Sequence, residues 1–126
     1  MKVIDDAKPG SGSFVAGGHR YRVEWAPSAG APGGQTARFD PSSLRFPLEL
    51  RAWLPGDRIR LDYGSKKLKK LLQERRVGLR RRGTVPVVVD SVGEVLWVPG
   101  VARSVLALPP ADGSVLEITV RDGDSQ

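Results

Sequence analysis

The sequence feature that most constrains the fold is the run of residues 85–89, which reads Val-Pro-Val-Val-Val. A β-branched run with proline confined to its start is typical of a strand buried on both faces. Asp90 and Gly93 then begin and end a four-residue stretch typical of a type I turn. Residues 95–98 are apolar again and predict the hairpin partner of the first strand. We therefore expect a β-rich fold built around this hairpin.

Further strands are expected on both sides of the hairpin. The alternation of apolar and polar residues, bounded by glycine and proline, predicts them at residues 14–16, 21–25, 46–53, 58–61, 104–108 and 115–120. Residues 1–6 are interpreted as a short strand or a loose end, residues 8–13 as a break, and residues 39–44 as a turn. Pro55 before Gly56 predicts a type II turn.

One helix is expected, opening at Ser65 as its N-cap. Leu68, Leu71 and Leu72 form a single apolar stripe at helical spacing. Residues 79–82 are interpreted as one further helical turn. The predicted fold class is therefore α+β, a β-rich domain with one main basic amphipathic helix.

The 126 residues are expected to form one domain. Residues 26–35 hold two prolines and three glycines and predict a flexible loop, and residues 122–126 are interpreted as a tail. The chain has no cysteine and no apolar run of membrane-spanning length. We expect a soluble, cytoplasmic protein that makes no use of a membrane.

The positive charge of the chain is concentrated in one segment. The formal net charge is +6, but residues 66–82 carry nine lysines and arginines against one acid, Glu74, so the rest of the chain is net −2. This one-sidedness favours a localised anionic partner, with RNA first and an anionic membrane surface second. The alternative interpretation is a solvated cationic helix that aids solubility.

The expected helix start sharpens this interpretation. Lys66 and Lys67 would lie in the first turn, where cations oppose the helix dipole by a few tenths to about 1 kcal/mol each. An anion docked at that end would relieve the conflict. Lys69, Lys70 and Arg76 extend the same face, which favours phosphate as the anion.

The remaining basic residues and the aromatic residues bear on the kind of RNA. Residues 80–82 are three arginines, suited to phosphate or guanine edges or, equally, to a solvated loop. Trp25, Trp53 and Trp97 do not interleave with basic residues, so a stacking platform for single strands is not indicated. Backbone contact with a structured, A-form RNA fits better.

Catalytic and metal-binding patterns are missing from the sequence. No Ser/His/Asp or Cys/His pair can be proposed, and the carboxylates occur singly rather than in a cluster that could hold a metal. Asp57 and Asp90 are better explained as turn-forming residues than as catalytic acids. We expect no enzymatic activity of this chain alone, no metal and no cofactor.

A resemblance to a known family spans residues 51–104. The residues that carry it are Arg51, Pro55 to Arg58, Lys66 to Lys69, Arg82, Val85 to Asp90, Gly93, Glu94 and Leu96 to Gly100. In their order and spacing this stretch resembles the C-terminal domain of bacterial tRNA(Ile)-lysidine synthetases. The resemblance implies a sandwich-like α+β domain similar to one in the phenylalanyl-tRNA synthetase β subunit.

The resemblance also implies a function. In that family an N-terminal ATP-dependent domain attaches lysine to the wobble cytidine of an isoleucine tRNA, and the C-terminal domain grips the acceptor-stem region. The family's Ser-Gly-Gly-x-Asp-Ser nucleotide loop is missing here, so only tRNA docking is carried over. ATP and lysine would belong to a catalytic domain that acts in cis or in trans. The alternative is a stand-alone RNA-binding or assembly module of the same fold. The residues expected to contact RNA are Arg51, Arg58, Ser65, Lys66, Lys67, Lys69, Lys70, Arg76, Arg80, Arg81, Arg82 and Arg103.

Overall fold

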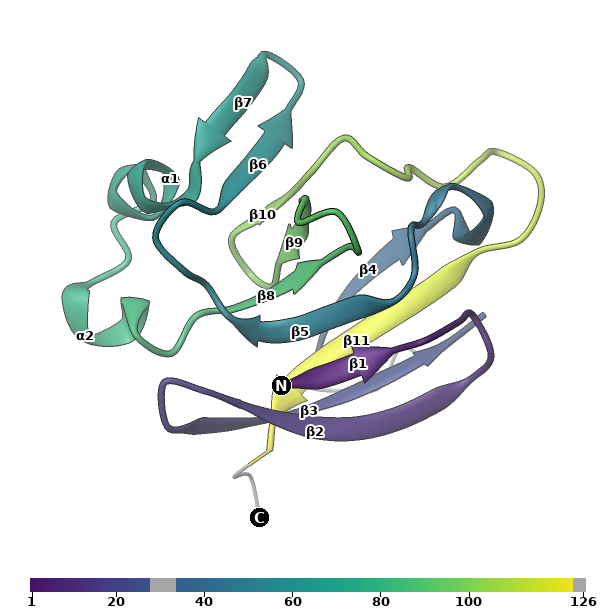
Figure 1. Cartoon of the computed structure of the whole chain (residues 1–126), viewed down its shortest axis with the longest axis horizontal. Coiled ribbons are helices and arrows are strands. Elements are labelled where there is room, and N and C mark those ends of the chain that lie inside the picture. Colours follow the sequence, from purple (N-terminus) through teal and green to yellow (C-terminus); the bar gives the residue numbers. More distant parts are fainter. Residues whose placement is uncertain (28–33, 124–126) are drawn as a thin grey trace.

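The computed structural model describes residues 1–27 and 34–123, which form two β-sheets and short helices (Figure 1). The larger sheet has the order β1 (Lys2–Ile4), β5 (Leu48–Ala52), β8 (Pro86–Val89), β9 (Val95–Val98), β6 (Arg58–Leu61) and β7 (Gly64–Lys67), and β10 (Ala102–Arg103) also pairs with β9. The smaller sheet has the order β2 (Gly10–Ala16), β3 (His19–Ala26), β11 (Leu116–Asp122) and β4 (Gln35–Phe39). The helices are the 3-10 turn η1 (Pro41–Ser43), α1 (Leu68–Glu74) and α2 (Leu79–Arg82). The α+β, strand-rich fold class is confirmed.

The hairpin predicted at residues 85–98 is confirmed as antiparallel β8 and β9 at the centre of the larger sheet. Val88 lies opposite Trp97 and Val89 opposite Val95, so Leu96 is an extra residue in β9. Such a β-bulge interrupts the alternation of side chains between the two faces. Leu96 and Trp97 consequently pack on the same side as Val88.

The larger sheet is buried on both faces, as the valine run predicts. One core lies between the two sheets, where Val88 and Trp97 pack with residues of the smaller sheet such as Phe39 and Ile118. The second core lies under α1, and its members include the leucine stripe of the helix and the remaining hairpin valines: Leu68, Leu71, Leu72, Val87, Val89, Val95 and Val98. In Figure 1, α1 lies beside β6 and β7, and α2 lies beyond α1 on the same side of the molecule, in the segment that leads into β8.

The expected helix start is wrong. Ser65 and Lys66 belong to β7, where they pair with Arg60 and Ile59 of β6. This pairing satisfies the backbone groups of the β6–β7 hairpin, and the helix begins only at Leu68, with Lys67 as its N-cap. Ser65 is therefore not a cap, and the cations placed at the start of the helix are Lys67, Lys69 and Lys70 in place of Lys66 and Lys67. The helical turn at residues 79–82 is confirmed as α2.

The break expected at residues 8–13 is also wrong from Gly10 onward, because β2 already begins there and pairs with β3. The glycine has a packing reason. A Cβ at Gly10 would lie 2.5 Å from Cζ2 of Trp25, which is buried between the sheets. Because Gly10 has no side chain, β2 can pass over the indole of Trp25, although residues 8–13 have the composition of a turn.

The ends of the expected loop and tail are strand residues. Ala26 ends β3, Gln35 begins β4 and Asp122 ends β11, while residues 28–33 and 124–126 lie outside the described residues. The strand predicted at residues 104–108 is wrong, since β10 covers only Ala102–Arg103. The strands predicted at residues 21–25, 58–61 and 115–120 correspond to β3, β6 and β11.

The two turn aspartates act as predicted. Asp57 accepts a hydrogen bond from the Leu54 amide at 2.7 Å across a turn in which Gly56 has φ of 96°. Asp90 accepts from the amides of Val92 and Glu94 at 3.1 and 2.9 Å. Both carboxylates are thereby used to hold turns.

Candidate nucleic-acid interface

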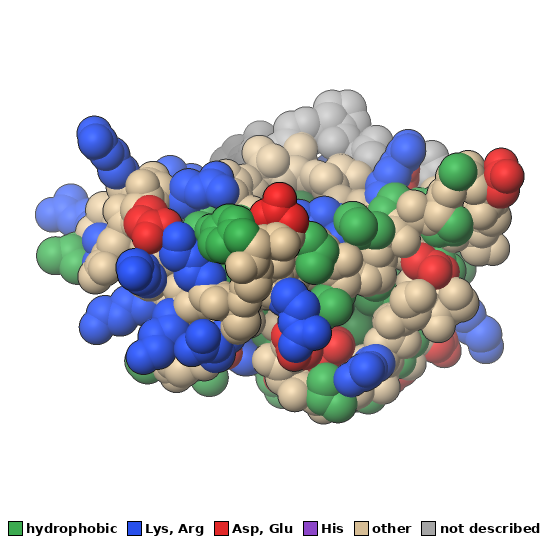
Figure 2. Space-filling view, turned by 90° about the horizontal axis from the view of Figure 1, so that it is seen from above, with side chains coloured by type: hydrophobic (Ala, Val, Ile, Leu, Met, Phe, Trp, Pro, Cys, Tyr) green, Lys and Arg blue, Asp and Glu red, His purple; other side chains and the backbone are tan. Residues whose placement is uncertain are grey.

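Exposed cations gather on β6, β7, α1 and α2, and we call this region, residues 58–82, the basic end. Figure 2 shows blue side chains crowded at this end of the molecule. The leucines of α1 face inward, so its charged residues must face solvent. The exposed basic residues are Arg58, Arg60, Lys67, Lys69, Lys70, Arg75, Arg76, Arg80 and Arg81, of which Arg60 is paired with Glu94. Arg75 is a member that the sequence analysis left out, and it donates from Nη1 to the Val101 carbonyl at 3.0 Å.

A hollow of about 430 Å³ lies at the β6–β7 hairpin. Arg58 and Ser65 line the hollow, and Arg58 donates from Nε to Ser65 Oγ at 3.0 Å. Three lysines, Lys66, Lys67 and Lys70, also line it. Tyr63 at the hairpin tip is 70% exposed and also lines the hollow. The sequence analysis missed this tyrosine because it considered tryptophans alone, although Tyr63 lies three residues before the lysine run.

Lys66 differs from the neighbouring lysines because its charge is already paired within the fold. Its ammonium group forms an ion pair with Glu74 and lies 5.6 Å from the ring centroid of Tyr63. The hydrogen bond to Glu74 raises the pKa of Lys66, and the same bond lowers the pKa of Glu74. Lys66 therefore orients the aromatic ring and the end of α1, and it offers less free charge than its neighbours.

Arg51 is engaged within the fold. Its guanidinium forms a two-pronged contact with Asp57, with Nη1–Oδ2 at 3.0 Å and Nη2–Oδ1 at 3.1 Å. It also donates to the Ala52 carbonyl at 2.9 Å, and its side chain is 19% exposed. Arg51 thus ties the end of β5 to the turn that leads into β6.

Arg103 is likewise engaged. Its guanidinium lies over the Phe39 ring at 4.4 Å from the centroid and donates to backbone carbonyls of Arg38, Ser104, Leu106 and Ala107. Burial lowers the pKa of this guanidinium. The side chain thereby holds the segment after β10 against β4.

The three arginines of α2 differ from one another. Arg82 is half-buried and donates from Nε to the Val77 carbonyl at 2.7 Å, while its own carbonyl accepts from Trp53 Nε1 at 2.6 Å. Arg80 and Arg81 remain exposed. The structure thus leaves two of the three guanidinium groups available to a partner.

The chemistry of this region is electrostatic. The basic end offers several unpaired cations, an exposed aromatic ring and the Ser65 hydroxyl, which are suited to phosphates and to the face of a base. Within residues 1–27 and 34–123, no group of three His, Cys, Asp or Glu side chains is placed to hold a metal ion. No helix in that part of the chain is long and apolar enough to cross a membrane.

Comparison with solved structures defines the class of the domain. The chain matches a structure described as "Crystal structure of TILS C-terminal domain" with a TM-score of 0.71 and 26% identity, over 98% of this chain and 100% of that one. An N-terminal fragment of the phenylalanyl-tRNA synthetase β-subunit from Pyrococcus horikoshii matches with a TM-score of 0.58 over 70% of this chain and 28% of that one. The second pair is 21% identical, so it shows a shared fold alone. The chain has the strand-rich α+β fold of these domains.

Comparison with sequences defines the family. Residues 48–116 match the model of the TilS substrate C-terminal domain, and the chain belongs to that family. It is 39% identical to the tRNA(Ile)-lysidine synthase of Bacillus subtilis over 59% of this chain and 17% of that protein. It is 49% identical to the tRNA(Ile)-lysidine synthase of Exiguobacterium sibiricum over 47% of this chain and 14% of that protein. The matches thus span less than a fifth of the length of these relatives. The resemblance inferred from the sequence is confirmed.

Proposed function

We propose that this chain is a tRNA-docking domain that binds the RNA backbone through its basic end. The observation that carries the proposal is a set of exposed cations at the basic end that form no ion pair within the described part of the chain: Lys67, Lys69, Lys70, Arg76, Arg80 and Arg81. Charge of one sign on one surface attracts a polyanion and gives most of its sequence-independent affinity. The relatives are tRNA(Ile)-lysidine synthases, which makes an isoleucine tRNA the RNA to test first.

The docking role implies a partner domain. Because the matches cover less than a fifth of the relatives' length, the lysine-attaching activity would reside in a separate ATP-binding domain, in cis or in trans. This chain would hold the acceptor-stem region while that domain acts on the wobble cytidine. What supports docking over catalysis is that the aspartates at turns and the half-buried arginines are engaged in the fold.

The basic end has two kinds of contact to offer. Lys67, Lys69 and Lys70 would meet phosphates, which position an RNA without reading its bases. Tyr63 would stack on an exposed base or ribose at the edge of the same hollow. Lys66 would act indirectly, by holding the Tyr63 ring and Glu74.

The proposal is tested by charge reversal of Lys67, Lys69 and Lys70 together. Their side chains lie off the leucine stripe, so the fold should persist. We expect the Kd for an isoleucine tRNA to rise by about 10–100-fold at moderate salt, measured by fluorescence anisotropy with circular dichroism as the folding control. Unchanged affinity in a folded triple variant would contradict the proposal.

The absence of catalysis is tested separately. The purified chain, given ATP, lysine and tRNA, should form neither lysidine nor AMP. Conversion of ATP to AMP in amounts matching the lysine attached would overturn this part of the proposal.

A further inference from the structure

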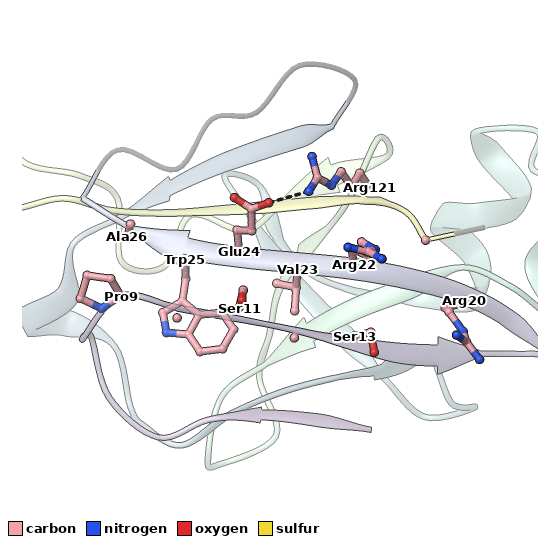
Figure 3. A pocket seen from close by; sticks show the side chains of 13 residues that line it. Pro9, Ser11, Ser13, Arg20, Arg22, Val23, Glu24, Trp25, Ala26 and Arg121 are labelled. Atoms are coloured by element: carbon pink, nitrogen blue, oxygen red, sulfur yellow. Dashed lines mark hydrogen bonds and ion pairs between the residues drawn. The ribbon is translucent and has the colours of Figure 1, made fainter. Parts of the chain in front are cut away.

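A second arginine-rich surface lies on the outer face of the smaller sheet, away from α1. In β3, Tyr21, Val23 and Trp25 point inward to the core, so Arg20, Arg22 and Glu24 point outward. Figure 3 shows Glu24 and Arg121 on one side of these strands and Val23 and Trp25 on the other. The strands border a hollow of about 690 Å³, which Ser11 and Ser13 of β2 also line. We call Ser11, Ser13, Arg20, Arg22 and Arg121 the arginine face.

The charges of the arginine face are incompletely balanced. Arg22 lies directly opposite Arg121 in the pairing of β3 with β11, and like charges at opposite positions destabilise a sheet. Glu24 neutralises Arg121 through an Nη2–Oε1 contact of 2.7 Å. Arg20 and Arg22 are exposed and form no ion pair with any residue in the described part of the chain. Two arginines on the same face of β3 therefore have no counter-charge from residues 1–27 and 34–123.

The other charged groups near this surface are already paired. Arg38 of β4 contacts Glu117 of β11 at 2.7 Å. Asp122 at the end of β11 contacts His19 at the start of β3 at 3.2 Å. Within the described residues these carboxylates are thus engaged with other partners, and an external anion would balance Arg20 and Arg22.

The arginine face is continuous with the basic end. The turn between β2 and β3 packs on the end of α2, where a Cβ at Gly17 would lie 1.7 Å from the Gly83 carbonyl oxygen. Tyr21 donates its hydroxyl to the Thr84 carbonyl at 2.5 Å across the same junction. A hollow of about 180 Å³ there is lined by both Arg81 and Arg121. Arg81 of α2 therefore connects one set of arginines to the other.

We infer that the arginine face binds the phosphate backbone of the same RNA, beyond the part held by the basic end. The inference rests on the proposed function, because it extends that RNA around the molecule. An extended polyanion fits the surface, since the free guanidinium groups lie along a strand in an open hollow and not around one closed pocket. Val15 is the one large apolar residue among the outward-facing positions of β2, β3 and β11, all of which the structure describes, which disfavours a lipid surface.

The test replaces Arg20 and Arg22 by glutamine and measures binding of an isoleucine tRNA transcript across a salt series. Both side chains are exposed, so the fold should be unaffected. The matched control is Lys8→Gln with Arg45→Gln, which removes the same charge from exposed residues outside both surfaces. We expect R20Q/R22Q to weaken binding by about three- to tenfold and to lower the salt slope by about one to two, with no such change in the control.

Two outcomes separate this inference from the proposed function. If reversal of Lys67, Lys69 and Lys70 abolishes binding but R20Q/R22Q behaves as the control does, the arginine face is overturned as an RNA contact and an acidic protein partner becomes the explanation for it. If neither variant weakens binding, the proposed function and the inference fall together.

Discussion

The central β8–β9 hairpin and the strands of the basic end belong to one sheet, yet the hairpin buries its side chains whereas the basic end exposes most of its charged ones. Along the hairpin every strand residue is buried, and Val88 and Val89 point into different cores. At the basic end the leucines of α1 are buried, while the cations beside them face solvent. The hairpin residues are thus explained by their contribution to stability, whereas the exposed cations are not, and this difference is what the proposed RNA interface would explain.

The largest effects on stability are expected in the hairpin. Trp97→Ala removes an aromatic ring that is 5% exposed and should lower the free energy of unfolding by about 3–5 kcal/mol. Val88→Asp places a carboxylate in the same core and should prevent stable folding. Urea unfolding followed by circular dichroism measures both.

The control for the hairpin variants is Val92→Asp, in the turn between β8 and β9, where the side chain is 59% exposed. This variant should unfold like the wild type. Cooperative, wild-type-like unfolding of Val88→Asp would show that the hairpin does not occupy the centre of the fold.

A smaller effect is expected from Arg103→Ala, which tests whether a basic residue can matter without touching RNA. The change leaves the carbonyls of Ser104, Leu106 and Ala107 without their charged donor, in a segment where Ala107 has φ of 52°. We expect a loss of about 2–4 kcal/mol in the free energy of unfolding, against little change for the exposed Arg45→Ala. Where the variant is folded, its tRNA affinity should equal that of the wild type. A large loss of affinity in the folded variant would show that Arg103 contributes to RNA binding.

The smallest effect is expected from Glu74→Gln, which frees Lys66. Lys66 lowers the pKa of Glu74, so the stability from this carboxylate is present above its unfolded pKa and is lost as the pH falls through its folded pKa. The variant should therefore lose less stability than the wild type on acidification, as measured by thermal unfolding between neutral and acidic pH. At neutral pH it should bind tRNA about two- to threefold more tightly, because one acid has left the basic end. Weaker binding would show that the ion pair positions Tyr63 for the RNA.

The central hairpin could be predicted from sequence because local and tertiary preferences agree there. The valine run, the turn at Asp90 and the partner strand each favour the same structure. The leucine stripe of α1 was equally clear, since its spacing leaves one face to bury. The family resemblance rested on these same residues.

Other elements could not be predicted because tertiary packing decides them. Gly10 reads as a turn residue, but it serves a strand that passes over Trp25. Ser65 reads as a helix cap, but pairing with β6 places it in a strand. Arg51 and Arg103 look like RNA ligands within a basic protein, and their carboxylate and carbonyl partners lie in turns that sequence alone does not bring near them. Arg20 and Arg22 went unnoticed because their exposure and their alignment with Arg121 depend on strand register.

The most direct test of the central claim is the salt dependence of tRNA binding when the free cations alone are removed. The variant replaces Lys67, Lys70, Arg80 and Arg81 by glutamine, and the control is again Lys8→Gln with Arg45→Gln. The plot of log Kd against log salt concentration should become shallower by about three to four for the quadruple variant and stay unchanged for the control, since each lost phosphate contact removes a slope on the order of one. An unchanged slope in a folded quadruple variant would mean that these cations only face solvent, and the account of the basic end as an RNA interface would be wrong.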